Sequence, residues 1–109
     1  MLPVYYIDFA AKPILTCEKS LKDQTLKAKH SLILMVNIQA TPKANVKWFH
    51  GDKEVLQTNN VTIETEESFS RLTIKGLTGK QTGTYKIAAE NKVGKAEEEF
   101  SVTVKGTNT

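Results

Sequence analysis

The chain has 109 residues, of which 39% are hydrophobic and 25% are charged, and its formal net charge is +3. This length fits one domain and is too short for two of ordinary size, while the apolar content is too high for a disordered chain. Because the lysines are spread along the sequence among acids, we expect no nucleic-acid partner. No apolar run approaches the roughly 20 residues that cross a bilayer, so we expect no membrane partner.

The single cysteine, Cys17, cannot form a disulfide within the domain. Small secreted domains usually carry several cysteines in even numbers, so this count favours a reducing compartment. Residues 1–12 have no basic segment followed by a long apolar run and do not resemble a signal peptide. We expect residues 1–12 to form a linker or lead-in, residues 13–105 to form the domain and residues 106–109 to form a polar tail.

Short segments that alternate apolar and polar residues follow one another through the domain, separated by turn signals. This pattern is typical of an all-β sandwich or barrel, and no stretch shows a sustained helical period with caps. In chain order, the expected strands are Ile14–Lys19, Leu21–Lys29, Ser31–Gln39, Asn45–His50, Lys53–Leu56, Val61–Thr65, Arg71–Leu77, Thr84–Glu90 and Lys95–Lys105.

The apolar positions of these strands define an inward face, because side chains alternate between the two faces of a strand. The main inward residues are Leu34, Val36, Ile38, Val46, Trp48, Leu72, Ile74, Tyr85, Ile87, Ala89, Phe100, Val102 and Val104. The same period also turns Glu98 inward, which either a β-bulge or an early departure of the strand from the core would resolve.

Glycines mark two expected hairpin turns. Gly51 directly follows a predicted strand and precedes Asp52, an order that fits a type II′ turn. Gly94 closes a loop that begins at Asn91, and we expect it to be able to adopt a positive φ.

Trp48 lies on a predicted central strand, and Gly83-Thr84-Tyr85 opens a late one. This arrangement resembles the intermediate-set immunoglobulin family, in which a tyrosine follows a glycine at the corner before a late strand. The resemblance implies a Greek-key sandwich of two antiparallel sheets, with Trp48 in the core and the Tyr85 hydroxyl bonded to upstream backbone. The residues that carry it are Val36, Trp48, Gly83, Tyr85, Ile87, Ala89, Asn91 and Gly94.

The resemblance places Val36 and Ile87 where the family usually has the two cysteines of its inter-sheet disulfide. A native disulfide in a small secreted domain is typically worth about 2–5 kcal/mol, so an extracellular module would seldom lack it. The aliphatic pair therefore indicates a cytoplasmic module, similar to those of titin, twitchin, obscurin and myosin-binding proteins. Gln81 is a second departure, because the family usually has an aspartate there that often makes a buried ion pair.

No residues have the spacing of a catalytic or metal site. His30 and His50 belong to different parts of the predicted sandwich, and Cys17 has no predicted base partner. The acids within residues 64–67 and 97–99 are more typical of solvated strand faces than of a calcium site. We expect no enzyme activity, no cofactor and no metal in this chain.

These observations predict a structural and scaffolding module of a giant sarcomeric or cytoskeletal protein, whose mechanical resistance comes from pairing between its terminal strands. Its expected partners are neighbouring immunoglobulin or fibronectin-type modules, with actin, myosin or other sarcomeric proteins as candidates. Lys43, Lys47 and Lys53 form the candidate partner surface. The alternatives are an extracellular adhesion or receptor module, favoured by the glycosylation pattern at Asn60, and a regulatory module beside a kinase domain.

Overall fold

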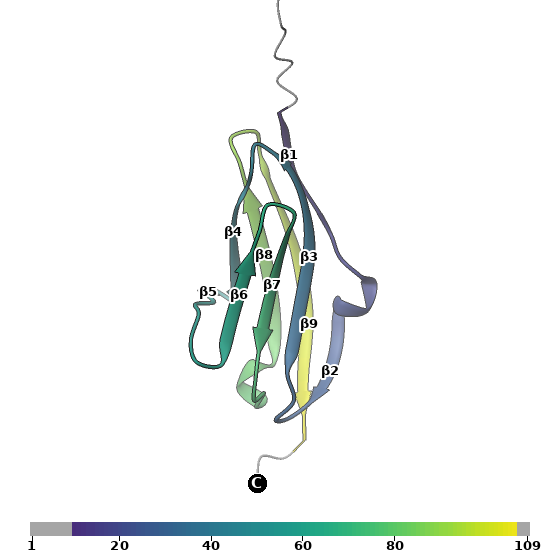
Figure 1. Ribbon diagram of the computed structural model, residues 1–109. Helices are drawn as coiled ribbons and strands as arrows, with labels where there is room; N and C mark the ends of the chain where they lie inside the picture. The colour runs from purple at the N-terminus through teal and green to yellow at the C-terminus, as the bar shows by residue number, and fades with distance from the viewer. Residues whose placement is uncertain (1–9, 107–109) are drawn as a thin grey trace, which may run out of the picture.

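The computed structural model describes residues 10–106, which form a sandwich of two β-sheets (Figure 1). In spatial order, the first sheet contains β1 (Ala11–Thr16), β3 (Leu32–Thr41), β7 (Phe69–Ile74) and β6 (Val61–Thr65). The second sheet contains β2 (Asp23–Lys27), β9 (Lys95–Lys105), β8 (Gly83–Glu90), β4 (Asn45–His50) and β5 (Lys53–Glu54). The expected two-sheet immunoglobulin-like sandwich is confirmed.

Two short 3-10 helices interrupt the strands, namely η1 (Lys19–Leu21) and η2 (Gly79–Gln81). Among residues 10–106, no helix has the length and hydropathy required to span a membrane. Within residues 10–106 the strand pairs are antiparallel apart from β2 and β9, which pair in parallel. β1 pairs with β3 in the first sheet whereas β2 belongs to the second, so the chain crosses from one sheet to the other between β1 and β2.

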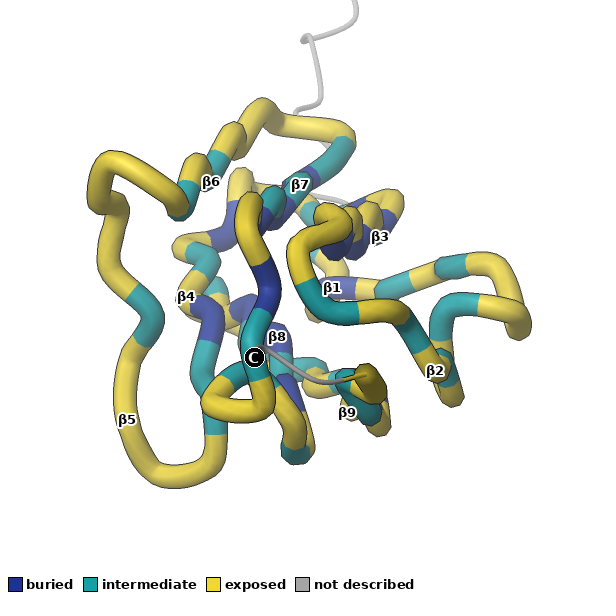
Figure 2. Tube along the Cα trace, turned by 90° about the horizontal axis from the view of Figure 1, so that it is seen from below, coloured by how far each residue is buried: buried dark blue, intermediate teal, exposed yellow. Residues whose placement is uncertain are grey.

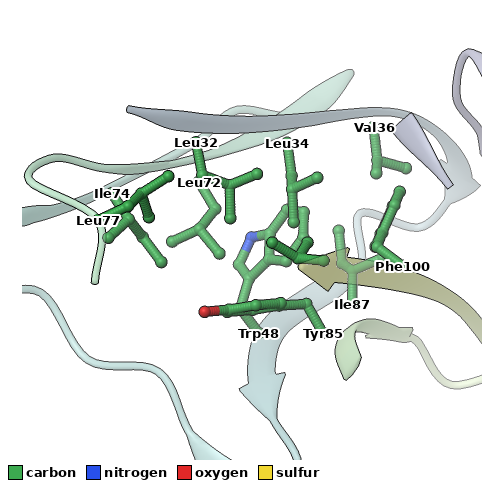
Figure 3. Close-up of a cluster of buried hydrophobic side chains, with 11 residues drawn as sticks. Leu32, Leu34, Val36, Trp48, Leu72, Ile74, Leu77, Tyr85, Ile87 and Phe100 are labelled. Carbon is green, nitrogen blue, oxygen red and sulfur yellow. The ribbon is translucent and has the colours of Figure 1, made fainter. Parts of the chain in front are cut away.

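One apolar cluster fills the space between the sheets (Figure 3). Strict alternation along β3 buries Leu32, Leu34 and Val36, while Ile33 and Met35 point outward and are exposed. Figure 2 shows the buried positions gathered between the two sheets, with exposed positions on the outside. Since burial of one such aliphatic side chain stabilises the fold by about 1.5–3 kcal/mol, this cluster is the main source of stability.

The first strand differs from its expected bounds. It begins at Ala11, earlier than the expected Ile14, and ends at Thr16. Its pairing with β3 shifts between Ala11 and Ile14, where Pro13 has no backbone N–H to contribute to the ladder. Most of the expected lead-in, residues 1–9, lies outside the described residues, as do residues 107–109 of the expected tail.

Other strands also differ from their expected bounds, and β2, for example, is shorter at both ends than the expected Leu21–Lys29. β5 ends at Glu54, because only Lys53 and Glu54 pair with β4. β7 begins at Phe69 and ends at Ile74, before the expected end at Leu77. Leu77 is nevertheless fully buried, because its backbone N–H donates to the His30 carbonyl at 3.0 Å and holds the loop against the core.

Glu98 leaves the core without a β-bulge. The pairing of β8 with β9 is continuous from Gly83 to Glu90, so no extra residue is inserted. The inward side of β9 is buried at Phe100 but only partly covered at Glu98, whose carboxylate pairs with Lys22. Of the two explanations that the sequence left open, the early departure from the core is therefore the one found.

The two predicted glycine turns have different outcomes. Gly51 has φ of 62° and joins β4 to β5, which agrees with the expected turn. The expectation of positive φ at Gly94 is wrong, since the positive-φ glycines of the described chain are Gly51, Gly76, Gly83 and Gly106. Gly94 instead packs closely against β1, because an added Cβ would lie 3.0 Å from the Cβ of Lys12.

Candidate interaction surfaces

The Trp48 ring lies in the centre of the sandwich and is 1% exposed (Figure 3). Its indole Nε1–H donates to Ser70 Oγ of β7 at 2.8 Å, and Ser70 Oγ also lies 3.0 Å from Thr65 Oγ1. The ring centroid lies 6.0 Å from that of Phe100. Trp48 therefore joins the two sheets by a hydrogen bond as well as by packing, and this arrangement leaves no free indole edge for a ligand.

The Tyr85 hydroxyl fixes the loop that precedes β8. It donates to the Gln81 carbonyl at 2.8 Å, and burial raises the pKa of Tyr85 to about 12. The His50 ring stacks on Tyr85 with centroids 4.3 Å apart, and His50 Nε2 lies 3.1 Å from the Thr82 carbonyl oxygen. An added Cβ at Gly83 would lie 2.8 Å from His50 Nε2, so glycine at this corner makes room for the stack.

Gln81 stabilises the same corner without a charge. Its Oε1 accepts from the Thr78 backbone N–H at 2.7 Å, while Thr78 Oγ1 accepts from Lys80 N–H at 3.2 Å. These reciprocal bonds form a capping box around η2. A neutral amide therefore closes the loop at the position where the family usually has an aspartate.

Val36 and Ile87 belong to the same buried cluster and are both 0% exposed. The free thiol of Cys17 lies elsewhere, partly buried against the edge of the core. Burial raises the pKa of Cys17, and the nearby Lys22 charge opposes this effect only partly. Since the thiolate is the reactive form of cysteine, Cys17 has the properties of a packing residue rather than a nucleophile.

Asn91 joins three segments at the end of the sandwich where β1 begins. Its Nδ2 donates to the carbonyls of Ala11 and Pro42 at 2.8 and 2.9 Å. Its Oδ1 accepts from the backbone N–H groups of Val93 and Gly94 at 3.0 and 3.1 Å. One side chain thus fixes the loop between β8 and β9, the loop before β4 and the start of β1.

Some of the acidic groups on the strands are compensated by nearby basic side chains. Glu64 pairs with Arg71, and Glu97 lies within 3.6–3.8 Å of the ammonium groups of Lys86 and Lys95. Over the described range 10–106, no three or more histidine, cysteine, aspartate or glutamate side chains are placed to hold a metal ion. These acids act as solvated partners of neighbouring cations.

Lys43, Lys47 and Lys53 are all exposed, but they do not form one patch. Lys43 precedes β4 and Lys53 follows it, so the length of this six-residue strand, roughly 17 Å, separates them. Lys47 faces outward from the middle of β4 and borders a shallow hollow with Phe49 and Lys86. The expected cluster is therefore corrected to three separate lysines along one edge of the second sheet.

Two residues of these arrangements, Ser70 and His50, were not given these roles from the sequence. Ser70 is polar in an otherwise apolar inward series with Leu72 and Ile74, a signal that could have marked it as a partner for a buried polar group. His50 has no such signal, because its contact with Tyr85 depends on the pairing of β4 with β8.

Comparison with known proteins gives a family model and several relatives. The model described as "Immunoglobulin I-set domain" matches residues 15–104. Titin of Drosophila melanogaster is 34% identical over 85% of this chain, the muscle M-line assembly protein unc-89 of Caenorhabditis elegans is 32% identical over 80%, and smooth-muscle myosin light chain kinase of Gallus gallus is 31% identical over 84%. The chain spans only 0%, 1% and 5% of their respective lengths, after rounding.

Among solved structures, the tandem titin immunoglobulin domains A164-A165 are similar with a TM-score of 0.82 and 26% identity. The match covers 90% of this chain and 51% of that one, so this chain corresponds to about one module of the tandem. The similarity extends over both sheets and places this chain beside modules that occur in series.

Proposed function

Since the chain belongs to the immunoglobulin I-set family, we propose that it is a structural and docking module of a giant sarcomeric or cytoskeletal protein in the cytoplasm. The similarity to titin and to unc-89 supports a place in a muscle protein of this size class. The aliphatic pair Val36 and Ile87 supports the cytoplasm, because the core at this point needs no oxidation.

The observation that carries the mechanical part of this proposal is the parallel pairing of β2 with β9. Five consecutive residue pairs run from Asp23 and Ser101 to Lys27 and Lys105. The ladder is extended at both ends, where Ser101 N–H donates to the Lys22 carbonyl at 2.8 Å and Ala28 N–H donates to the Lys105 carbonyl at 2.7 Å. Ala11 and Lys105 lie at opposite ends of the sandwich, so tension applied between them loads these bonds together, in shear (Figure 1).

Force spectroscopy on a tandem of identical modules tests the role of this pairing. Ala28→Pro removes the donor that bonds Lys105, whereas the control Thr58→Pro removes a comparable donor, bonded to the Val61 carbonyl at 3.0 Å, outside the β2–β9 pair. We expect both variants to lose about 1 kcal/mol in chemical unfolding but only Ala28→Pro to lower the unfolding force. Equal forces for the two variants would contradict a load path through β2 and β9.

The cellular part of the proposal is tested by labelling muscle tissue with an antibody against this domain, beside a denaturing blot. Periodic sarcomeric stripes and a very large band are expected. Cell-surface staining with a glycosidase-sensitive band would instead support an extracellular adhesion module, glycosylated at the exposed Asn60.

A regulatory module beside a kinase domain is a second candidate, favoured by the similarity to smooth-muscle myosin light chain kinase. In that case this chain would pack against a catalytic domain and perform no chemistry itself. Kinase activity in material captured with the same antibody, altered by adding the isolated module, would support this candidate over a purely structural one.

A further inference from the structure

Five exposed lysines gather at the end of the sandwich where β9 finishes, the end that Figure 2 views directly. We call this surface the basic end; its residues are Lys27, Lys29, Lys75, Lys80 and Lys105. They come from segments distant in sequence: the last residue of β2 and the turn after it, the loop from β7 through η2, and the last residue of β9. The lysines of the basic end are therefore neighbours only in the folded chain.

Backbone contacts hold these segments together. Lys27 and Lys105 are direct partners in the β2–β9 pair. Lys29 N–H donates to the Leu77 carbonyl at 2.7 Å, which joins the turn after β2 to the loop that carries Lys75 and Lys80. The basic end is thus a fixed feature of the fold.

The segments that carry these lysines contain no acid of their own, and Asp52, in the β4–β5 turn at the same end, forms no ion pair with them among residues 10–106. The segments 24–30, 75–80 and 103–106 contain no aspartate or glutamate, and in the described part of the chain none of the five lysines forms an ion pair. The chain has 15 basic and 12 acidic side chains, so without these five lysines it would hold ten basic and twelve acidic ones, a net charge of −2. The basic end therefore carries more than the whole net positive charge of the molecule.

The arrangement is repulsive within the isolated domain. Lys27 and Lys105 lie on adjacent strands, which are about 4.8 Å apart in a sheet, and both are exposed. Like charges on neighbouring strands destabilise a sheet. Three lysines elsewhere do have acidic partners, since Lys22 pairs with Glu98, and both Lys86 and Lys95 lie close to Glu97. The missing counter-charge at the basic end would be supplied by an acidic partner.

We propose that the basic end is a docking surface for an acidic polypeptide segment, rich in glutamate and aspartate, of a partner protein. This inference deepens the docking part of the function proposed above and rests on it. The surface contains lysines and no arginine, which gives compact point charges on flexible stems, suited to carboxylates spread along a segment. Bidentate recognition of phosphate favours arginine.

The basic end also lacks the features of other polyanion-binding surfaces. Apart from His30 it contains no aromatic side chain on which a nucleic-acid base could stack. Of the exposed large apolar side chains of the described chain, Ile33 borders it as the strand partner of Thr73, and one such side chain is too little apolar surface for stable insertion into a lipid surface. A polypeptide is therefore the partner that these residues fit best.

The test uses a short oligo-glutamate peptide as the probe, with binding followed by backbone amide chemical shifts. The variant Lys75→Glu, Lys105→Glu is compared with the control variant Lys43→Glu, Lys47→Glu, since both change two exposed lysines and shift the net charge equally. Lys53 is left unchanged in both variants, because the β4–β5 turn lies at the same end of the sandwich as the basic end. In the wild type, we expect the chemical-shift changes caused by the peptide to concentrate at the basic end, and its affinity for the peptide to fall with added salt. The basic-end variant should lose about tenfold in affinity, while the control variant should lose much less.

Several outcomes would overturn the proposal. Equal losses in the two variants would mean that only net charge matters, and a larger loss in the control would move the surface to the edge of β4. Absence of binding by wild type, or tighter basic-end binding of a DNA duplex or of anionic phospholipid vesicles, would exclude an acidic polypeptide. If either variant fails to fold, the same lysines are changed to glutamine instead of glutamate. The unfolding force of Ala28→Pro is measured without any peptide and does not depend on docking. Failure of the docking proposal and failure of the mechanical role are therefore distinguishable.

Discussion

Buried aromatic side chains stabilise this sandwich through their polar atoms as well as their rings. Trp48 and Tyr85 are almost fully buried, and each has its one polar hydrogen donated to a partner, Ser70 Oγ and the Gln81 carbonyl respectively. An unpartnered buried donor costs about 1–3 kcal/mol, so these pairs contribute to the choice of one register and not only to hydrophobic burial.

For Trp48, truncation to alanine should lower the free energy of unfolding by about 3–5 kcal/mol, measured by urea unfolding. Ser70→Ala should cost about 1–3 kcal/mol, because it leaves the buried indole N–H without its partner. The double variant Trp48→Phe, Ser70→Ala should cost less than the sum of its single changes, since neither partner is then left unpaired. A loss below about 1 kcal/mol for Trp48→Ala would contradict the position of the ring between the sheets.

For Tyr85, the raised pKa predicts a loss of stability in alkali. The pKa rises from the ordinary value of 10.0 to about 12 in the folded state, so the stabilising contribution is complete below pH 10 and is lost as pH rises through 12. Unfolding at pH 11 should therefore require roughly 1 kcal/mol less than at pH 8. Tyr85→Phe should be less stable at pH 8 and should show a smaller fall between the two pH values; an unchanged fall would mean that other groups cause it.

At the scale of elements, the loops matter as much as the strands in fixing the ends of the sandwich. Asn91 satisfies two carbonyls and two N–H groups from three segments, while Gln81 and Thr78 close η2 reciprocally. The parallel β2–β9 pair connects the strand that follows η1 to the last strand. These contacts position the chain where it enters and leaves the domain.

Asn91→Ala should lower the free energy of unfolding by about 1–3 kcal/mol and speed hydrogen exchange at Val93 and Gly94, whose N–H groups lose their acceptor. Asn91→Asp is the matched control, because it keeps the acceptor oxygen but cannot donate to Ala11 and Pro42. We expect near-normal exchange of the two N–H groups in Asn91→Asp. Fast exchange in both variants would mean that the donors to Ala11 and Pro42, rather than the acceptor, order the loop.

At the scale of the whole molecule, the two ends of the sandwich differ in chemistry. At the end where β1 begins, uncharged hydrogen bonds around Asn91 join the segments. At the end where β9 finishes, the segments carry the lysines of the basic end. Because tension between these ends loads β2 and β9, the proposed mechanical and docking roles share one pair of strands. Lys27 and Lys105 belong to both, which makes the effect of a bound acidic segment on unfolding force directly measurable.

The stability of the whole domain should not depend on redox conditions. The core at Val36 and Ile87 is aliphatic and the one cysteine of the chain has no intramolecular partner, so urea midpoints with and without dithiothreitol should coincide. Cys17→Ser should show the same insensitivity. A midpoint that falls with reductant in the wild type only would indicate a disulfide between chains through Cys17.

The sequence by itself determined the strands, their inward faces and the core positions of Trp48 and Tyr85, because period-two alternation and turn residues are local properties of the chain. Tertiary structure decided the rest. The departure of Glu98 from the core, the close approach at Gly94 and the hydrogen bond from Trp48 to Ser70 depend on which strands meet. The same holds for the basic end: its lysines are scattered in sequence, and only the parallel β2–β9 pair and the loops around it bring their charges together.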